Sequence, residues 1–114
     1  MTRTKRFCYS CDLKNDPELI EEYKAHHAPG AVPEAIVKSI KDAGIENMEI
    51  YLTGNRMFMI MEVNESFDPA KKAEMDANNP AVQKWEELMW KFQQSLPWAE
   101  KDEKWIALEK IFQL

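Results

Sequence analysis

In two stretches of the chain, residues 47–53 and residues 56–63, every second side chain is apolar, and the positions between them hold polar, charged and apolar residues. Gly54-Asn55 separates the two stretches. Successive side chains of a strand point to opposite faces, and a two-residue loop is a common hairpin connection, so this pattern predicts two antiparallel strands. One predicted face is apolar throughout: Met48, Ile50, Leu52, Met57, Met59 and Met61. The other face is mixed: Asn47, Glu49, Tyr51, Thr53, Arg56, Phe58, Ile60 and Glu62. We expect helices on the apolar face and a partner sheet on the mixed face, with a polar small-molecule pocket between the sheets.

Capping residues and apolar spacing predict the helices. An Asp or Asn followed by Pro is typical of a helix start, and it occurs at Asp16-Pro17, Asp68-Pro69 and Asn79-Pro80. The predicted helices cover residues 17–27, 33–43, 69–77 and 80–96, with Gly44 and Pro97 as stop signals. The last helix has the clearest apolar period: Val82, Trp85, Leu88, Met89, Phe92 and Leu96. Alternation near the two ends of the chain predicts two further strands, residues 3–13 and 104–114.

The predicted order of elements is β-α-α-β-β-α-α-β, the split β-α-β pattern of a ferredoxin-like domain. We therefore expect one α+β domain over residues 1–114, with a four-stranded antiparallel sheet and the helices on one face. The uncovered mixed face of such a sheet would be a large apolar patch in a monomer. Two sheets packed face to face bury it and form a dimeric α+β barrel, so the pattern also predicts a homodimer.

Composition excludes several classes of partner. The chain has 114 residues, 45% of them hydrophobic, and a formal net charge of -5. No cluster of Lys and Arg stands out, which argues against nucleic acid or an anionic membrane as a partner. No apolar run approaches the roughly 18 residues of a membrane span. The basic N-terminal residues precede a segment too short and too polar for a signal peptide, so we expect a cytoplasmic protein.

Cys8 and Cys11 form a single C-x-x-C. A redox pair of this type needs a helix N-terminus, where thiolates are stabilised, but this one lies in a predicted strand. An offset of three places the two sulfurs on opposite faces, so we interpret the cysteines as inert thiols. A zinc site would need a second Cys or His pair at ligand spacing, and none is present. No phosphate loop or dinucleotide motif occurs either, so the sequence predicts neither a metal nor an organic cofactor.

The two histidines of the chain are adjacent, His26 and His27, at the end of the first predicted helix. Imidazole titrates near neutral pH and suits proton transfer, although an exposed helix-end histidine is the simpler interpretation. Tyr23 lies four residues before His27 and therefore on the same side of the helix. Neighbouring helical side chains diverge by about 100°. We thus expect His27, rather than His26, to share a pocket with Tyr23.

Three further side chains are candidate ligands for a polar substrate. Trp85 lies in the apolar stripe of the last helix, either as a core residue or as a platform for a sugar ring. Glu86 beside it is either helix surface or a hydrogen-bond acceptor for a polyol. Arg56 shares the mixed face with Tyr51 and is otherwise a solvated turn residue.

These residues recur in an order that resembles the L-rhamnose mutarotase family. The pieces are Glu21-Glu22-Tyr23-x-x-x-His27, Glu49-Ile50-Tyr51-Leu52 after Gly44, Lys84-Trp85, and Glu109-x-Ile111-Phe112-x-Leu114. The resemblance covers nearly the whole chain and is closest to the L-fucose branch, through Asn55-Arg56-x-Phe58-Met59, Trp85-Glu86-x-Leu88-Met89-Trp90 and Glu103-Lys104-Trp105. The rhamnose branch typically has two consecutive tryptophans where this chain has Trp85-Glu86.

The resemblance implies a sugar mutarotase that interconverts the α and β anomers of a 6-deoxy-aldopyranose, L-fucose before L-rhamnose. His27 matches the proton donor of the family, and Glu86 takes the place of its second tryptophan. The positions that contact the sugar are matched by Tyr23, Tyr51 and Trp85. Ring opening and closure by acid–base catalysis requires no cofactor.

Two other functions fit the same barrel. A cofactor-free monooxygenase would need a more apolar cavity, and Glu49, Arg56 and Glu62 on the mixed face argue against it. A non-catalytic binding module would hold a ligand without accelerating a reaction. The concentration of Tyr, His and Trp at the matched positions favours the enzyme.

Overall fold

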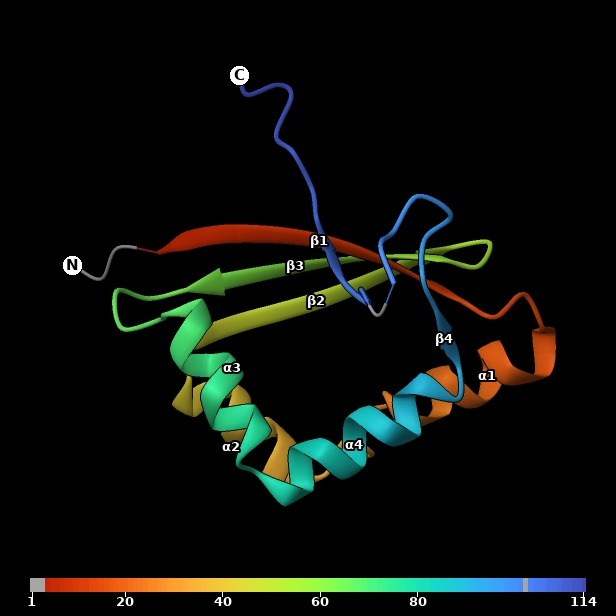
Figure 1. Cartoon of the computed structure of the whole chain (residues 1–114), viewed down its shortest axis with the longest axis horizontal. Helices are drawn as coiled ribbons and strands as arrows, with labels where there is room; N and C mark the ends of the chain where they lie inside the picture. The colour runs from red at the N-terminus through yellow and green to blue at the C-terminus, as the bar shows by residue number, and fades with distance from the viewer. Residues whose placement is uncertain (1–3, 102) are drawn as a thin grey trace.

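A computed structural model describes residues 4–101 and 103–114 of the chain. Its elements are β1 (Lys5–Leu13), α1 (Pro17–His26), α2 (Glu34–Asp42), β2 (Ile45–Thr53), β3 (Arg56–Val63), α3 (Pro69–Ala77), α4 (Pro80–Trp90), β4 (Gln93–Gln94) and β5 (Ile106–Ala107). The sheet is antiparallel with the order β2-β3-β1-β4, and β5 pairs with β1 as well. The helices lie together on one face of this sheet (Figure 1). The α+β, ferredoxin-like prediction is thereby confirmed.

The predicted helix starts are present with their caps. The side chain of Asp16 accepts hydrogen bonds from the first-turn amides of α1, and Asp68 and Asn79 do the same for α3 and α4. Each of these caps satisfies backbone N–H groups that have no partner inside the helix. Gly44 follows α2 with a φ of 93°, a left-handed conformation that glycine adopts without strain.

The central hairpin has the predicted register. Thr53 pairs with Arg56, Tyr51 with Phe58 and Glu49 with Ile60. β2 begins two residues earlier than expected, at Ile45, because a register shift between Ile45 and Asn47 lets the strand continue past its regular pairing. The alternation of residues 47–53 could not reveal these two extra residues.

The last predicted helix was too long. α4 ends at Trp90, and Gln93 and Gln94 form the short strand β4 against Leu13 and Asp12. Phe92 and Leu96 are buried although they lie outside the helix. Their burial explains why the apolar period continues: the segment has left the helix but still packs against the core.

The predicted final strand over residues 104–114 was also wrong for most of its length. Only Ile106 and Ala107 pair with β1, and the backbone amide of Leu108 donates to the carbonyl of Cys8. The chain then leaves the sheet and extends away from the body of the molecule (Figure 1). Ile111 is 89% exposed and Phe112 is also exposed. Alternation alone predicted pairing, but the described chain offers these residues no strand to pair with.

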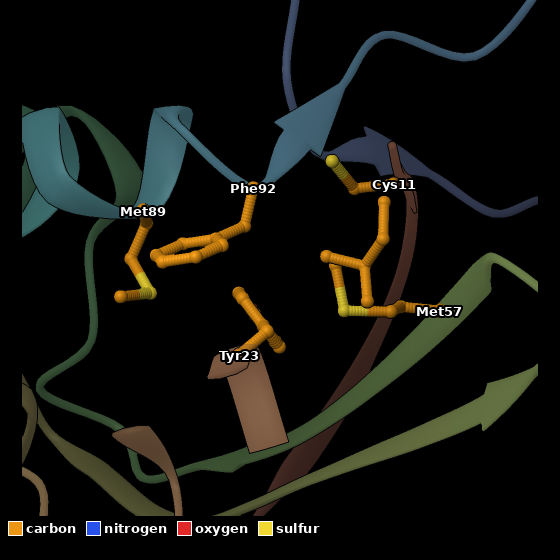
Figure 2. Packing of buried hydrophobic residues seen from close by; sticks show 6 residues of the cluster. Cys11, Tyr23, Met57, Met89 and Phe92 are labelled. Carbon is orange, nitrogen blue, oxygen red and sulfur yellow. The ribbon is translucent and has the colours of Figure 1, made fainter. Parts of the chain in front are cut away.

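The main core lies between the sheet and helices α1 and α4. Figure 2 shows Phe92 over Tyr23, with Met89 beside them and Cys11 next to Met57. Both cysteines are free, and burial raises the pKa of the Cys11 thiol to about 11. This thiol is protonated near neutral pH, which fits the packing role predicted for it. No helix in the described part of the chain is long and apolar enough to cross a membrane. The cytoplasmic location stays a prediction.

Candidate active site

A cavity of about 650 Å³ lies between the helices and the sheet face that they cover. Its volume is in the range of small-molecule sites. The apolar face of the hairpin contributes Met48, Ile50, Met59 and Met61 to its wall. Other parts of the chain contribute Tyr23, His27, Trp85, Glu86, Met89, Gln93, Lys104 and Trp105. The cavity thus lies on the apolar face of the hairpin, whereas we expected the pocket on the mixed face.

His27 and Tyr23 form one stacked unit at the end of α1. Their rings lie 4.3 Å apart between centroids, at an angle of 31°. The Nδ1 atom of His27 is 2.8 Å from the carbonyl oxygen of Tyr23. A carbonyl oxygen only accepts, so Nδ1 carries a proton and donates it to this bond. The spacing of four residues along the helix is what brings the two side chains together, as predicted.

The environment of His27 favours the neutral ring. Burial lowers the pKa of His27 below its ordinary value of 6.5, and the hydrogen bond to Tyr23 offsets only part of this effect. The structure records no hydrogen bond from Nε2 to any described residue. With Nδ1 protonated and engaged, Nε2 carries the lone pair of the neutral ring. His27 therefore presents one nitrogen that can take up and return a proton.

Tyr23 is held more tightly than His27. Its side chain is only 5% exposed, and the ring meets Phe92 edge to face at 6.1 Å. The Nε2 atom of Gln93 donates to the Tyr23 hydroxyl oxygen over 3.2 Å. Burial raises the pKa of Tyr23 to about 12, so the hydroxyl keeps its proton at neutral pH. Tyr23 can thus donate a hydrogen bond into the cavity but cannot serve as a base.

Trp85 of α4 completes this end of the cavity. Its ring lies 5.5 Å from that of His27 at an angle of 64°, an edge-on contact. The side chain is partly buried against the core cluster and also lines the cavity. The structure thus shows the packing of Trp85 on the core together with its access to the cavity, and the role of platform for a sugar ring stays a prediction. A flat apolar surface beside polar groups suits the apolar face of a sugar ring.

Glu86 lines the cavity from its exposed rim. The Nζ atom of Lys104 lies 3.5 Å from the backbone carbonyl of Glu86 and 5.0 Å from the centre of the Trp90 ring. Lys104 thereby ties the segment before β5 to α4. This contact leaves the carboxylate of Glu86 available for a ligand.

Tyr51 and Arg56 do not line this cavity. Tyr51 is 53% exposed on the opposite face of the sheet, where its hydroxyl donates to Glu49 over 2.8 Å. Arg56 donates to both carboxylate oxygens of buried Asp12, at 2.8 and 3.1 Å, and its guanidinium lies 4.9 Å from the centre of the Trp98 ring. Strand alternation explains this placement, because Tyr51 points away from Ile50 and the rest of the cavity wall. The cavity of the single chain is therefore lined from the apolar face, and the binding roles expected for Tyr51 and Arg56 stay predictions.

His26 packs beside the cavity rather than in its wall. Its ring lies 5.5 Å from Phe92 and 6.4 Å from Trp85, and His26 is not among the residues that line the cavity. The sequence argument that chose His27 over His26 from the spacing to Tyr23 agrees with this placement.

Sequence reasoning missed Gln93, Lys104 and Trp105 as wall residues. Gln93 was assigned to a helix that in fact ends at Trp90, and the other two to the start of a strand. Hydrophobic spacing does not mark them, since they reach the cavity through the turns that follow α4 and precede β5, although Lys104 and Trp105 belong to a piece that carries the family resemblance. In the described residues, no three His, Cys, Asp or Glu side chains gather as a metal site would require.

Comparison with known proteins agrees with this arrangement. The family model described as L-rhamnose mutarotase matches residues 6–114. The chain belongs to the L-rhamnose mutarotase family. An L-fucose mutarotase of Xanthomonas campestris pv. campestris is 44% identical over 96% of this chain and 88% of its own length. A UPF0734 protein of Dictyostelium discoideum is 34% identical over 96% of this chain and 90% of its own length.

Solved structures show the same fold. The crystal structure of an L-rhamnose mutarotase from Formosa agariphila covers 96% of this chain and 98% of its own, with a TM-score of 0.68 and 26% identity. A tetracenomycin F2 cyclase from Streptomyces glaucescens covers the same shares, with a TM-score of 0.62 and 13% identity. The second likeness concerns the fold alone. As a member of the mutarotase family, the chain is a carbohydrate mutarotase, an isomerase that interconverts the anomers of a free sugar.

Proposed function

We propose that the sugar is L-fucose and that His27 moves the proton on which ring opening depends. The observation that carries the catalytic part is the stacked pair of His27 and Tyr23 in the cavity wall, with Trp85 edge-on beside it. The choice of sugar is supported by the relative named L-fucose mutarotase. It is also supported by Glu86, which stands where the rhamnose branch has a second tryptophan.

The state of His27 sets the direction of the first proton transfer. Its pKa is lowered by burial, and Nδ1 is engaged by the carbonyl of Tyr23. The neutral ring therefore begins as a base, and Nε2 takes the proton of the anomeric hydroxyl while the bond from the anomeric carbon to the ring oxygen breaks. The resemblance alone implied the reverse order, with His27 as the donor to the ring oxygen.

The proton can then pass to the ring oxygen from the same nitrogen. The anomeric and ring oxygens are bonded to one carbon, so both lie within reach of a single imidazolium. The neutral hydroxyl of Tyr23 donates a hydrogen bond that stabilises the oxygen as negative charge develops on it. The open aldehyde rotates about its bond to the neighbouring carbon, and the reverse steps close the ring on its other face. No net proton is gained or lost.

The remaining wall residues have binding roles. Trp85 stacks on the apolar face of the sugar ring, and the carboxylate of Glu86 accepts hydrogen bonds from ring hydroxyls. Fucose and rhamnose differ only in hydroxyl stereochemistry. A site that hydrogen-bonds a hydroxyl discriminates strongly against a sugar whose hydroxyl points elsewhere.

The test of this function is exchange between the two anomeric signals in NMR, measured by saturation transfer on equilibrated L-fucose and L-rhamnose. Wild-type protein at micromolar concentration should accelerate exchange of L-fucose. His27→Ala should lower the rate at least about a hundredfold, whereas His26→Ala, outside the cavity wall, should retain most of it. Circular dichroism establishes that both variants are folded. Full activity of folded His27→Ala would remove the catalytic assignment, and acceleration of L-rhamnose alone would change the substrate.

We also propose that two chains pair through the outer face of the sheet. Tyr51 is exposed there, and Phe58 and Ile60 are only partly covered in the single chain. Together they form an apolar surface of the kind that soluble monomers avoid. Because the catalytic cavity lies on the other face, pairing in this way leaves it open to substrate.

A further inference from the structure

Gln93 is a buried polar side chain whose amide nitrogen makes a hydrogen bond and whose amide oxygen makes none. The residue is 4% exposed and belongs to the cavity wall. Its Nε2 donates to the Tyr23 hydroxyl over 3.2 Å. Its Oε1 has no hydrogen-bond partner among residues 4–101 and 103–114, and it is the one buried side-chain N or O atom there with this property.

An unpartnered buried acceptor is costly. Leaving a buried polar group without a hydrogen bond forfeits its hydration and typically costs about 1–3 kcal/mol. Native proteins satisfy the great majority of such groups, so each exception calls for an explanation, of which a role at a functional site is one. The location of Gln93 favours this explanation, because it lines the cavity and its neighbour in the hydrogen bond is Tyr23, which stacks on His27.

We propose that Gln93 is a specificity-determining substrate ligand, whose Oε1 accepts a hydrogen bond from a ring hydroxyl of the bound sugar. This inference rests on the proposed mutarotase function of the cavity. A free sugar carries a hydroxyl donor on nearly every ring carbon, and Oε1 is an acceptor that selects one of them by position. The hydroxyl that meets Oε1 replaces the missing partner, whereas a sugar without it leaves the acceptor unpaired.

The same amide also orients Tyr23. Because Nε2 of Gln93 donates its hydrogen bond to the Tyr23 hydroxyl oxygen, the hydroxyl proton of Tyr23 remains free for donation to the sugar. Burial keeps that proton in place by raising the pKa of Tyr23 to about 12. Gln93 therefore links recognition of one hydroxyl to the donor that stands beside His27.

The experiment uses Gln93→Met, which keeps the length of the side chain and removes the amide. Gln94→Met is the matched control, since Gln94 is the next residue of β4 and is exposed. Each protein is tested for anomeric exchange with L-fucose and with its monodeoxy analogues, each lacking one ring hydroxyl. Wild type and Gln94→Met should disfavour one analogue by about 10- to 100-fold. In Gln93→Met the ratio of the rate with L-fucose to the rate with this analogue should fall to about one, because the rate with L-fucose itself is lower.

Full discrimination in Gln93→Met would overturn the inference while leaving the mutarotase function intact. Binding of the same sugars, measured by titration calorimetry, distinguishes a failure of the proposed function from a failure of the inference. If wild type binds sugars without accelerating exchange, the proposed function fails. In that case a Gln93-dependent preference in binding still supports the inference, and its absence overturns it. If wild type neither binds nor converts any sugar, both are overturned.

One measurement does not depend on how well the variant folds. In the wild-type protein, the side-chain amide signals of Gln93 should shift on titration with L-fucose and stay in place with the disfavoured analogue. Unmoved signals at a saturating concentration of L-fucose would overturn the inference.

Discussion

The imidazole of His27 stacks on the ring of Tyr23 at 4.3 Å and donates through Nδ1 to the carbonyl oxygen of the same residue, 2.8 Å away. One residue thus fixes both the orientation and the tautomer of the other. The hydroxyl of Tyr23 is in turn held by Gln93. This chain of contacts holds an imidazole, a neutral hydroxyl and an amide oxygen in one wall of the cavity. In the proposed reaction they would serve as base, donor and acceptor, and preorganisation of this kind costs no rearrangement at the moment of reaction.

The pH dependence of the reaction should reflect the lowered pKa of His27. Burial favours the neutral ring, so the pKa of His27 lies below the ordinary value of 6.5. If the neutral ring is the working base, kcat/KM should be level at neutral pH and fall as the pH drops through the lowered pKa. Exchange rates of L-fucose measured between mildly acidic and neutral pH test this. A rate that rises on acidification would show that the imidazolium is the active form.

The lowered pKa of His27 also makes the stability of the protein depend on pH. The folded pKa of His27 is below the unfolded value, so the unfolded chain takes up the proton first as the pH falls below 6.5. The contribution of the neutral ring is therefore complete above 6.5 and lost as the pH falls towards the folded pKa. His27→Gln should show a smaller decrease in unfolding free energy than wild type over this window, measured by urea titration. Equal decreases in the two proteins would contradict the pKa shift.

Glu86→Trp tests the selection of the sugar. The change restores the paired tryptophans typical of the rhamnose branch and removes a carboxylate from the rim of the cavity. Exchange of L-fucose should slow by about tenfold or more, since a hydrogen bond to a charged acceptor is lost, and exchange of L-rhamnose should improve. Glu87→Trp adds the same ring next along α4 and should keep the wild-type preference. An unchanged preference in Glu86→Trp would show that Glu86 is not the selector.

Gly44→Ala should be strongly destabilising. The residue has a φ of 93°, and a Cβ atom there would lie 2.7 Å from both Asn64 Oδ1 and Ser66 Oγ. Backbone strain and crowding together should cost about 3 kcal/mol of unfolding free energy. Gly54→Ala shares the positive φ but has no atom within 4 Å of the added Cβ, so it should cost about 1 kcal/mol. Equal losses in urea titrations of the two variants would contradict the crowding at Gly44.

The oligomeric state should depend on the outer face of the sheet. Light scattering at micromolar concentration should give the mass of two chains for wild type. Ile60→Glu places a charge within the proposed interface and should yield the mass of one chain, because an unpaired charge is costly to bury. Lys71→Glu introduces the same side chain on exposed α3 and should remain dimeric. A single-chain mass for wild type would remove the dimer altogether.

Much of the fold follows from local chemistry. Asp16, Asp68 and Asn79 start helices because their side chains reach the first amides of the same helix. The Gly54-Asn55 turn sets the register of the hairpin because only two residues connect the strands. The stacking of His27 on Tyr23 follows from a spacing of four on one helix. All of these contacts span a few residues, so they are visible in the sequence.

The end of α4, the short pairing of the C-terminal segment and the position of the cavity depend instead on distant residues. Apolar spacing continues through Phe92 whether the backbone is helical or not, and the edge of β1 is what turns Gln93 into a strand residue. Alternation separated the two faces of the hairpin correctly. It did not reveal that the helices leave a cavity over the apolar face. By itself, the sequence determined most of the elements and the stacking of His27 on Tyr23, because these rest on local spacing. Only the tertiary structure decided that Tyr51 and Arg56 lie outside the cavity and that Gln93 lies in its wall, because side chains from separate elements meet there through packing.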